Sequence, residues 1–337
     1  MSADVEKTPQ DAILTAYHEH WFSGNVGRDV LPRSLNLLCA SHDLPIPIKN
    51  GFPLQFSTEA SVDLADEPEL MELMVQANFR QVFVGLESPR TASLAETHKH
   101  QNVRGDSLLA KVRRIRDAGL VVIAGFIVGF DSDDIDIFDE QRRFIGASGI
   151  AQASVTVLSP LPTTPLYDRL EREGRLDSSD PEVAFVPAQM TQRQLREGHT
   201  ALVRALYEPE AYLERVFTGY CESRAFRRRR ARLEREIGGT NLGARLLRQI
   251  GGLRIAARLA GTLAHEGLLR RLAGVYVRFY ARNLVLGADA IPLDRYVMLC
   301  ILHWHFFKMA RHHRKTSFGN PMLEARAGAA PFEELAS

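Results

Sequence analysis

The sequence lacks the features that mark several common protein classes. Its 337 residues contain only three cysteines, Cys39, Cys221 and Cys300, and these lie far apart. Such spacing gives neither a disulfide framework nor a zinc site, and it is typical of a reducing, cytoplasmic compartment. No run of about 18 apolar residues is free of charge, so no transmembrane helix is expected. The N-terminus, MSADVEKTPQDA, has no basic segment followed by an apolar one, so no signal peptide is expected.

Charge is balanced over the whole chain but uneven within it. The formal net charge is +1, which gives no reason to expect a nucleic-acid partner. Between Arg224 and Arg282, however, there are 15 arginines and no lysine, against only three glutamates. The densest part, Arg224–Arg235 (RAFRRRRARLER), could contact a membrane through anionic lipid headgroups, or it could be an ordinary solvated helix face.

The middle of the chain alternates short β-branched segments with amphipathic ones. The expected strands are 53–57, 81–86, 121–128 and 153–158, with helices expected at 68–77, 105–118 and 134–147. This alternation predicts βαβ units and a parallel sheet, hence an α/β fold. Four units are too few for a closed eightfold barrel, so the sheet is either open or a partial barrel. The apolar runs within 118–129 (AGLVVIAGFIVG) and 155–167 (VTVLSPLPTTPLY) are typical of strands buried on both faces.

Four parts can be distinguished by composition. We expect an irregular N-terminal segment (1–50), a β/α region (51–180), a helical C-terminal domain (181–315) and a disordered tail (316–337). The helices expected in the third part are Gln192–Leu206, Pro209–Gly219, an arginine-rich segment to Glu236, Ala244–His265, Gly267–Leu286 and Asp294–Arg311.

Small residues border the third expected strand at its carboxyl end, where parallel folds bind ligands. Gly125 and Gly129 would let a flat cofactor approach the backbone closely, or they could serve strand packing alone. After the fourth strand, LSPLPTTPLY has three prolines in six residues. These prolines stiffen a loop, which could form a fixed binding surface or a rigid connector.

Hydroxyl and carboxylate groups follow the first two expected strands. Ser57 and Glu59 come after one, and Glu87 and Ser88 after the next. If these groups meet at one end of the sheet, they could accept hydrogen bonds from a ribose or an α-amino group. They could equally be helix caps.

Histidines gather near the C-terminus, at His303, His305, His312 and His313. Residues two apart on a helix point to different sides, and no acidic ligand lies nearby. No metal site is predicted there.

Taken together, four segments resemble a known family. FSTEASVDLAD, FVGLESP, RDAGLVVIAGFIVGFDSDD and LPTTPLYDRLEREGRL follow the order and spacing of the later β/α units of the radical S-adenosylmethionine superfamily. The group most similar pairs this barrel with a cobalamin-binding domain. The resemblance continues through Leu202–Val216 and the segment ILHWHFFKMARHH, and it covers most of the chain.

The resemblance implies a partial (β/α)6 barrel that binds S-adenosylmethionine at the carboxyl ends of its strands. It implies that Ser57, Glu59, Glu87 and Ser88 lie near the amino-acid and ribose parts of the cofactor, Gly125 and Gly129 on its adenine side, and Leu161 and Pro162 in the loop after the last strand. In the family that loop usually reads PGTP, and here Thr163 replaces the glycine.

The chain also departs from the family. Members hold a [4Fe–4S] cluster through CxxxCxxC, which this sequence does not contain, and the cobalamin-binding half is absent as well. We therefore expect an N-terminally truncated form of an enzyme that transfers methyl groups to an unactivated carbon of a lipid or tetrapyrrole-like substrate, impaired by loss of the cluster motif. The alternatives are a non-catalytic binding or scaffold remnant, which acts through a nucleoside pocket or its basic helices, and an unstable relic.

Overall fold

The structure is a computed structural model, and it describes residues 56–77, 79–96, 102, 104–180, 182–238, 242–287 and 290–312. All of these belong to one of the two compact units of the chain, Phe56–Ser337. The expected N-terminal segment (1–50), with Cys39, and the expected tail (316–337) lie outside the described residues.

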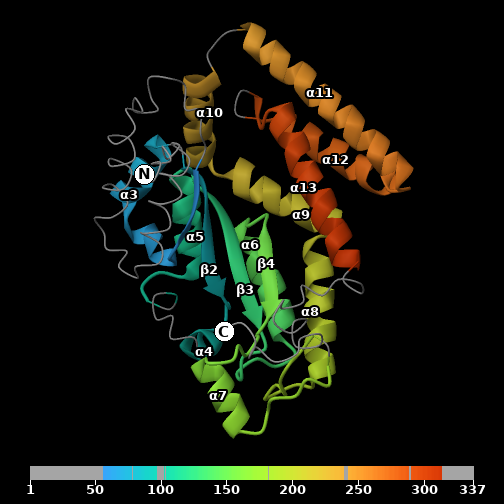
Figure 1. The fold of residues 1–337 in the computed structure, drawn as a ribbon. Helices are drawn as coiled ribbons and strands as arrows, with labels where there is room; N and C mark the ends of the chain where they lie inside the picture. The colour runs from blue at the N-terminus through green and yellow to red at the C-terminus, as the bar shows by residue number, and fades with distance from the viewer. Residues whose placement is uncertain are drawn as a thin grey trace, which may run out of the picture. The chain divides into compact units, whose positions relative to one another are not determined.

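Four parallel strands form one sheet in the order β1-β2-β3-β4. The strands are β1 (Phe56–Ala60), β2 (Phe79–Glu87), β3 (Val121–Val128) and β4 (Ala153–Val157). The arrows of β2, β3 and β4 all point toward the helices α4 (Thr91–Glu96) and α7 (Pro165–Arg172), which mark the carboxyl edge of the sheet (Figure 1). The predicted α/β fold with a parallel sheet is confirmed, whereas its closure into a partial barrel stays a prediction.

The helices between the strands begin and end where local residues dictate. Helix α3 (Pro68–Gln76) has proline in its first turn, where no backbone N–H is needed. Helix α5 (Leu108–Asp117) starts at Ser107, whose hydroxyl accepts a hydrogen bond from the Ala110 amide. Helix α6 (Ile137–Ser148) ends at Gly149, which has a φ of 73°. The short helices α4 and α7 were not predicted.

Helices cover only one face of the sheet in the part of the chain that the structure describes. Along β3 every second residue is buried, and along β4 buried residues alternate with exposed ones, as at Ser154. The prediction that these strands are buried on both faces is therefore wrong, because an apolar run can lie in a sheet with one covered face. We call the other side the open face, formed by Ser57, Glu59, Gln81, Phe83, Gly85, Val121, Ile123, Gly125, Ile127, Ser154 and Thr156.

Six helices follow the sheet in the helical C-terminal region, close to the expected positions. They are α8 (Gln192–Leu206), α9 (Pro209–Phe217), α10 (Arg224–Gly238), α11 (Leu242–His265), α12 (Leu269–Leu284) and α13 (Leu293–His312). Among the described helices, none is both long and apolar enough to cross a membrane.

Arg215 of α9 connects this helical region to the sheet. Its side chain is 2% exposed. The guanidinium donates to the carbonyls of Ile150 at 2.9 Å, Ala211 at 3.1 Å and Leu206 at 2.6 Å. Leu206 is the last residue of α8, so the cation meets the negative end of a helix dipole. Burial lowers the pKa of Arg215 to about 10.

Candidate functional site

Two glycines lie side by side in the middle of the open face. Gly85 of β2 lies beside Gly125 of β3, and neither has a side chain to cover the sheet. A Cβ added at Gly125 would lie 3.0 Å from the ring of Phe83. Glu59, an exposed residue of β1, is the register partner of Phe83. The Phe83 ring therefore lies over Gly125, and this aromatic ring shares one surface with the exposed carboxylate of Glu59.

The structure corrects the predicted position of Ser57 and Glu59. Both lie within β1 rather than after it, because the strand runs to Ala60. Glu59 is level with Phe83, four residues before Glu87, which corresponds to roughly 13 Å along the strand. The expectation from the sequence that Glu59 and Glu87 meet at one edge of the sheet is therefore wrong.

Ser88 is a turn residue in the structure. It is completely buried, its amide donates to the Leu86 carbonyl at 2.8 Å, and its hydroxyl accepts from the Arg90 amide at 3.2 Å. These contacts shape the turn from β2 into α4.

Two backbone conformations at the carboxyl edge are unusual. Within the described ranges, Glu87 (φ 63°) and Thr163 (φ 71°) are the non-glycine residues with positive φ. Glu87 ends β2 beside an irregularity in the pairing with β3, and Thr163 lies between β4 and α7. Thr163 thus keeps the left-handed backbone that a glycine would adopt without strain. Strained conformations of this kind concentrate at binding sites.

The loop between β3 and α6 is held from within by Asp133. This side chain is fully buried. One carboxylate oxygen accepts from the amides of Gly129 and Phe130 at 2.8 and 3.1 Å, and the other accepts from the Ser93 hydroxyl at 2.6 Å. Burial raises the pKa of Asp133 in spite of these donors. The carboxylate fixes the backbone just where β3 ends.

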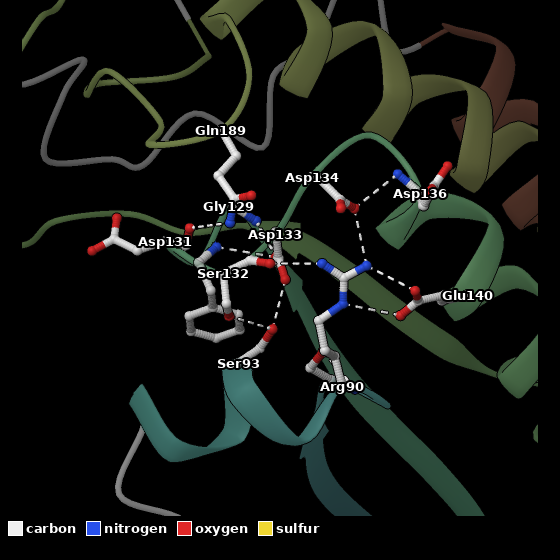
Figure 2. A network of polar contacts seen from close by, with 12 residues as sticks. Arg90, Ser93, Gly129, Asp131, Ser132, Asp133, Asp134, Asp136, Glu140 and Gln189 are labelled. Carbon is white, nitrogen blue, oxygen red and sulfur yellow. Dashed lines mark hydrogen bonds and ion pairs between the residues drawn. The ribbon is translucent and has the colours of Figure 1, made fainter.

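Arg90, at the start of α4, holds the same loop from outside. Its guanidinium makes a two-pronged contact with Glu140 at 3.1 and 2.7 Å, and it also donates to the Ser132 carbonyl at 2.6 Å and to Asp134 at 3.0 Å (Figure 2). Hydrogen bonding to Glu140 raises the pKa of Arg90 above its ordinary value. We call Arg90 and its partners the Arg90 network.

Asp131 connects the loop to α7. Its carboxylate pairs with Arg169 and with Arg175, the latter at 2.7 Å. Burial alone would raise the pKa of Asp131, but hydrogen bonds from the two arginines lower it below its usual range. The Asp131 amide donates to Glu96 at 2.9 Å, and its carbonyl accepts from Gln189 at 2.7 Å. Asp131 thereby links the loop to α4, to α7 and to the segment that contains Gln189.

The remaining predicted residues lie at the same edge with different surroundings. Gly129 has a φ of 106°, and an added Cβ would lie 2.9 Å from Leu195, so this glycine is needed for packing against α8. Leu161 is 41% exposed and Pro162 is half-buried. The structure thus brings Glu87, Gly129 and the loop with Leu161 to the carboxyl edge, while Ser57, Glu59 and Gly125 occupy the open face behind it.

The described thiols, Cys221 and Cys300, and the buried His303 are enclosed by protein groups. Cys221 and Cys300 are each 2% exposed, and burial raises the pKa of both thiols to about 12. His303 is fully buried, and both ring nitrogens are within hydrogen-bond distance, 2.6 Å from the Tyr276 hydroxyl and 3.1 Å from the Tyr207 carbonyl. Neutral, enclosed groups of this kind do not fit an iron–sulfur cluster or an axial ligand of cobalamin.

The residues that hold the site together were not predicted from the sequence. Arg90, Ser93 and Glu96 of the β2–α4 segment all contact the β3–α6 loop. The acidic run FDSDD after the β3 strand was a visible signal, since buried carboxylates need donors. Which arginine or serine supplies them depends on the folding of β2 beside β3.

Comparison with known proteins finds relatives that are named as methyltransferases. A family model described as a domain of unknown function (DUF4070) matches residues 164–317. An uncharacterized methyltransferase of Synechocystis is 41% identical over 179 residues, which cover 50% of this chain and 32% of that protein. The hopanoid C-2 methylase of Rhodopseudomonas palustris is 36% identical over 167 residues, with the same coverage. This chain is a distant homologue of methyltransferases.

A third relative extends the range of substrates. The bacteriochlorophyllide d C-12(1)-methyltransferase of Chlorobaculum tepidum is 25% identical over 167 residues, which cover 48% of this chain and 36% of that protein. The chain therefore spans about a third of the length of these relatives. By their names, two of them act on a hopanoid lipid and a bacteriochlorophyllide.

Proposed function

We propose that this chain is part of a radical S-adenosylmethionine methyltransferase whose substrate is a hopanoid-like lipid or a tetrapyrrole. The observation that carries the proposal is the open face, where Gly85 and Gly125 lie beside Phe83 and Glu59. Similarity to methyltransferases over half of the chain supports it. Our sequence-based expectation of a partial barrel is consistent with a strand face that no described helix covers.

The residues present suit S-adenosylmethionine. The adenine ring would lie against the Phe83 ring, which covers Gly125, close to Gly85 on the same face. The exposed carboxylate of Glu59 would accept hydrogen bonds from the α-ammonium group. When bound, this cofactor supplies the methyl group or the adenosyl radical.

The loops at the carboxyl edge would limit the site and position the substrate. Asp133 and the Arg90 network fix the loop after β3, so its backbone needs little reordering when a ligand binds. No step is assigned to a cluster or to cobalamin, because the described thiols and His303 do not fit them.

Isothermal titration calorimetry of the full chain with S-adenosylhomocysteine tests the binding step. We expect Gly125→Val to weaken binding at least tenfold, because the new methyl groups would occupy space beside the Phe83 ring. Glu59→Gln should weaken it several-fold through loss of an ionic hydrogen bond. Gly146→Ala is the matched control, since an added Cβ at Gly146 meets nothing within 4 Å.

The outcomes separate the proposal from its alternative. Absence of both heat and a thermal shift with either S-adenosylmethionine or S-adenosylhomocysteine would refute the proposed site and favour the non-catalytic interaction role. Binding that survives Gly125→Val would move the site away from the open face. Methyl transfer itself requires a separate assay with a hopanoid or a bacteriochlorophyllide as acceptor.

A further inference from the structure

Helix α11 is apolar on two opposite sides. Its inner side is buried, with Leu259 8% exposed and Leu263 2% exposed. On this side Gly252 lies so close to the start of α13 that an added Cβ would be 2.9 Å from the Asp294 nitrogen. These contacts account for the inner apolar residues, but not for those on the other side.

The opposite side carries large apolar residues in solvent. Leu246 is 62% exposed, Leu253 61% and Ile250 38%. Spacings of four and three residues place them on one side of the helix. The exposed residues Ala257, Ala260 and Ala264 continue the same line, and we call this row the outer stripe. A helix on the surface of a globular protein normally has polar residues there, so a second contact is indicated.

The charge beside the outer stripe has one sign. Arg254 and Arg258 lie next to it and are exposed. No carboxylate among the described residues forms an ion pair with either. Helix α11 contains four arginines and no acidic residue, as does α12. Within the part of the chain that the structure describes, the apolar row is therefore flanked by positive charge without an acidic partner.

Three of the four arginines of α12 provide the contrast. Arg271, Arg278 and Arg282 pair with Glu208, Glu210 and Glu214 at 3.1, 3.3 and 2.8 Å. Those three cations are matched within the chain, mostly by α9. Arg254 and Arg258 have no such match among the described residues, which favours an anionic partner for them.

We propose that the outer stripe docks on an anionic lipid bilayer. Leu246, Ile250 and Leu253 enter the headgroup layer, while Arg254 and Arg258 contact the phosphates, as in interfacial amphipathic helices. A second copy is a poor partner, because a twofold contact would bring the same arginines together. Nucleic acid offers phosphates but presents little apolar surface to three large side chains.

The proposed membrane contact differs from the one that was expected from the sequence. That expectation assigned the contact to Arg224–Arg235, and no observation tests it. Within that run, Arg227 donates to the Cys221 carbonyl, Arg229 pairs with Glu72, and Arg230 lies 5.7 Å from the Phe226 ring. These cations are engaged by protein groups, whereas those beside the outer stripe are not.

Vesicle co-sedimentation of the full chain tests this proposal. We expect binding to vesicles that mix phosphatidylglycerol with phosphatidylcholine, and much weaker binding to phosphatidylcholine alone. Replacing Arg254 and Arg258 together by Gln should lower the partition coefficient about 30-fold. Replacing Leu246 and Leu253 together by Gln should lower it at least tenfold.

Matched controls lie in other parts of the fold. Leu73→Gln removes an apolar side chain that is 51% exposed on α3, and Arg193→Gln removes an exposed arginine of α8. Neither should change vesicle binding by more than about twofold. Ile250→Trp gives a positive readout: binding should strengthen and the added tryptophan fluorescence should shift to the blue on vesicles, whereas Leu73→Trp should show neither effect.

Several outcomes would overturn the proposal. These are no binding to anionic vesicles, equal binding to neutral ones, or equal losses in the control variants. A chain that ignores vesicles but self-associates through Leu246 and Leu253 in analytical ultracentrifugation would indicate a protein interface instead. Because these variants leave Glu59 and Gly125 intact, S-adenosylhomocysteine binding should be unchanged, so this proposal can fail independently of the proposed function.

Discussion

Arg90 and Arg215 each join segments that are far apart in the chain, but they do so with different partners. Arg90 is 18% exposed in its side chain and neutralised by Glu140 and Asp134. Arg215 is almost fully buried and has three backbone carbonyls around it, with no acidic partner in the described part of the chain. One arginine holds the site loop, and the other holds the helical region to the sheet.

The two environments have opposite effects on the guanidinium groups. Hydrogen bonding to Glu140 raises the pKa of Arg90, whereas burial lowers that of Arg215 to about 10. At a solvated edge, carboxylates can pair with an arginine through full charges, because water still hydrates part of each ion. In the interior, the aligned carbonyls at the end of α8 provide partial charges without the desolvation cost of a second ion. Arg215 also lies 5.8 and 5.9 Å from the rings of Tyr207 and Tyr212, which favour a cation.

The largest expected effect is at the buried position. Arg215→Ala should lower the free energy of unfolding by about 4 kcal/mol, because three carbonyls lose charge-assisted donors. Urea denaturation measures this loss. Arg215→Lys should cost a similar amount, since one ammonium group cannot reach all three carbonyls. Arg193→Ala, at an exposed ion pair with Glu197 on α8, should change stability by less than about 1 kcal/mol. A loss below about 1 kcal/mol for Arg215→Ala would show that this arginine does not hold the two regions together.

A smaller effect is expected at the solvated edge. Arg90→Ala should cost about 2 kcal/mol and should speed hydrogen exchange at the Gly129 and Phe130 amides, because the loop loses its outer support. Arg90→Lys should restore less than half of the loss, as it cannot bind Glu140 with two prongs. Arg142→Ala, which removes an exposed pair with Asp139 on α6, is the control. Unchanged exchange in Arg90→Ala would mean that Asp133 alone holds the loop.

The smallest expected effect is a difference in acid response. Hydrogen bonding to Arg90 lowers the pKa of Asp134 below its ordinary value. Its contribution is therefore present above the unfolded pKa of about 4 and is lost as the pH falls through the lower folded value. The destabilisation caused by Arg90→Ala should shrink between pH 7 and pH 3, measured by urea denaturation at each pH. That caused by Arg215→Ala should stay constant, because carbonyls do not titrate. Equal acid sensitivity in both variants would contradict this distinction.

Much of the fold could be predicted from local patterns. The βαβ order, the start of α3 at Pro68 and the ends of α5 and α6 at Gly119 and Gly149 follow from periodicity and from the conformations of proline and glycine. The short helices α4 and α7 were missed, since six to eight residues carry too little periodicity.

The site was predicted less completely than the fold. Gly125 and Gly129 were expected to share one role, but Gly125 lies on the open face, whereas Gly129 packs against Leu195. Glu59 was expected next to Glu87, yet the register places it level with Phe83. A strand boundary misplaced by three residues is sufficient to cause the second error, because each residue advances the chain by about 3.3 Å.

The order of residues along the chain was sufficient to predict the alternation of strands and helices and the helix ends at glycine and proline. It was also sufficient to predict the similarity to methyltransferases, because all of these depend on neighbouring residues and their order. Three features required the folded structure: no described helix covers one face of the sheet, Arg90 and Asp133 hold the site loop, and Arg271, Arg278 and Arg282 of α12 are paired whereas Arg254 and Arg258 have no ion pair among the described residues. All of these properties depend on contacts between residues far apart in the chain, and local patterns do not encode such contacts.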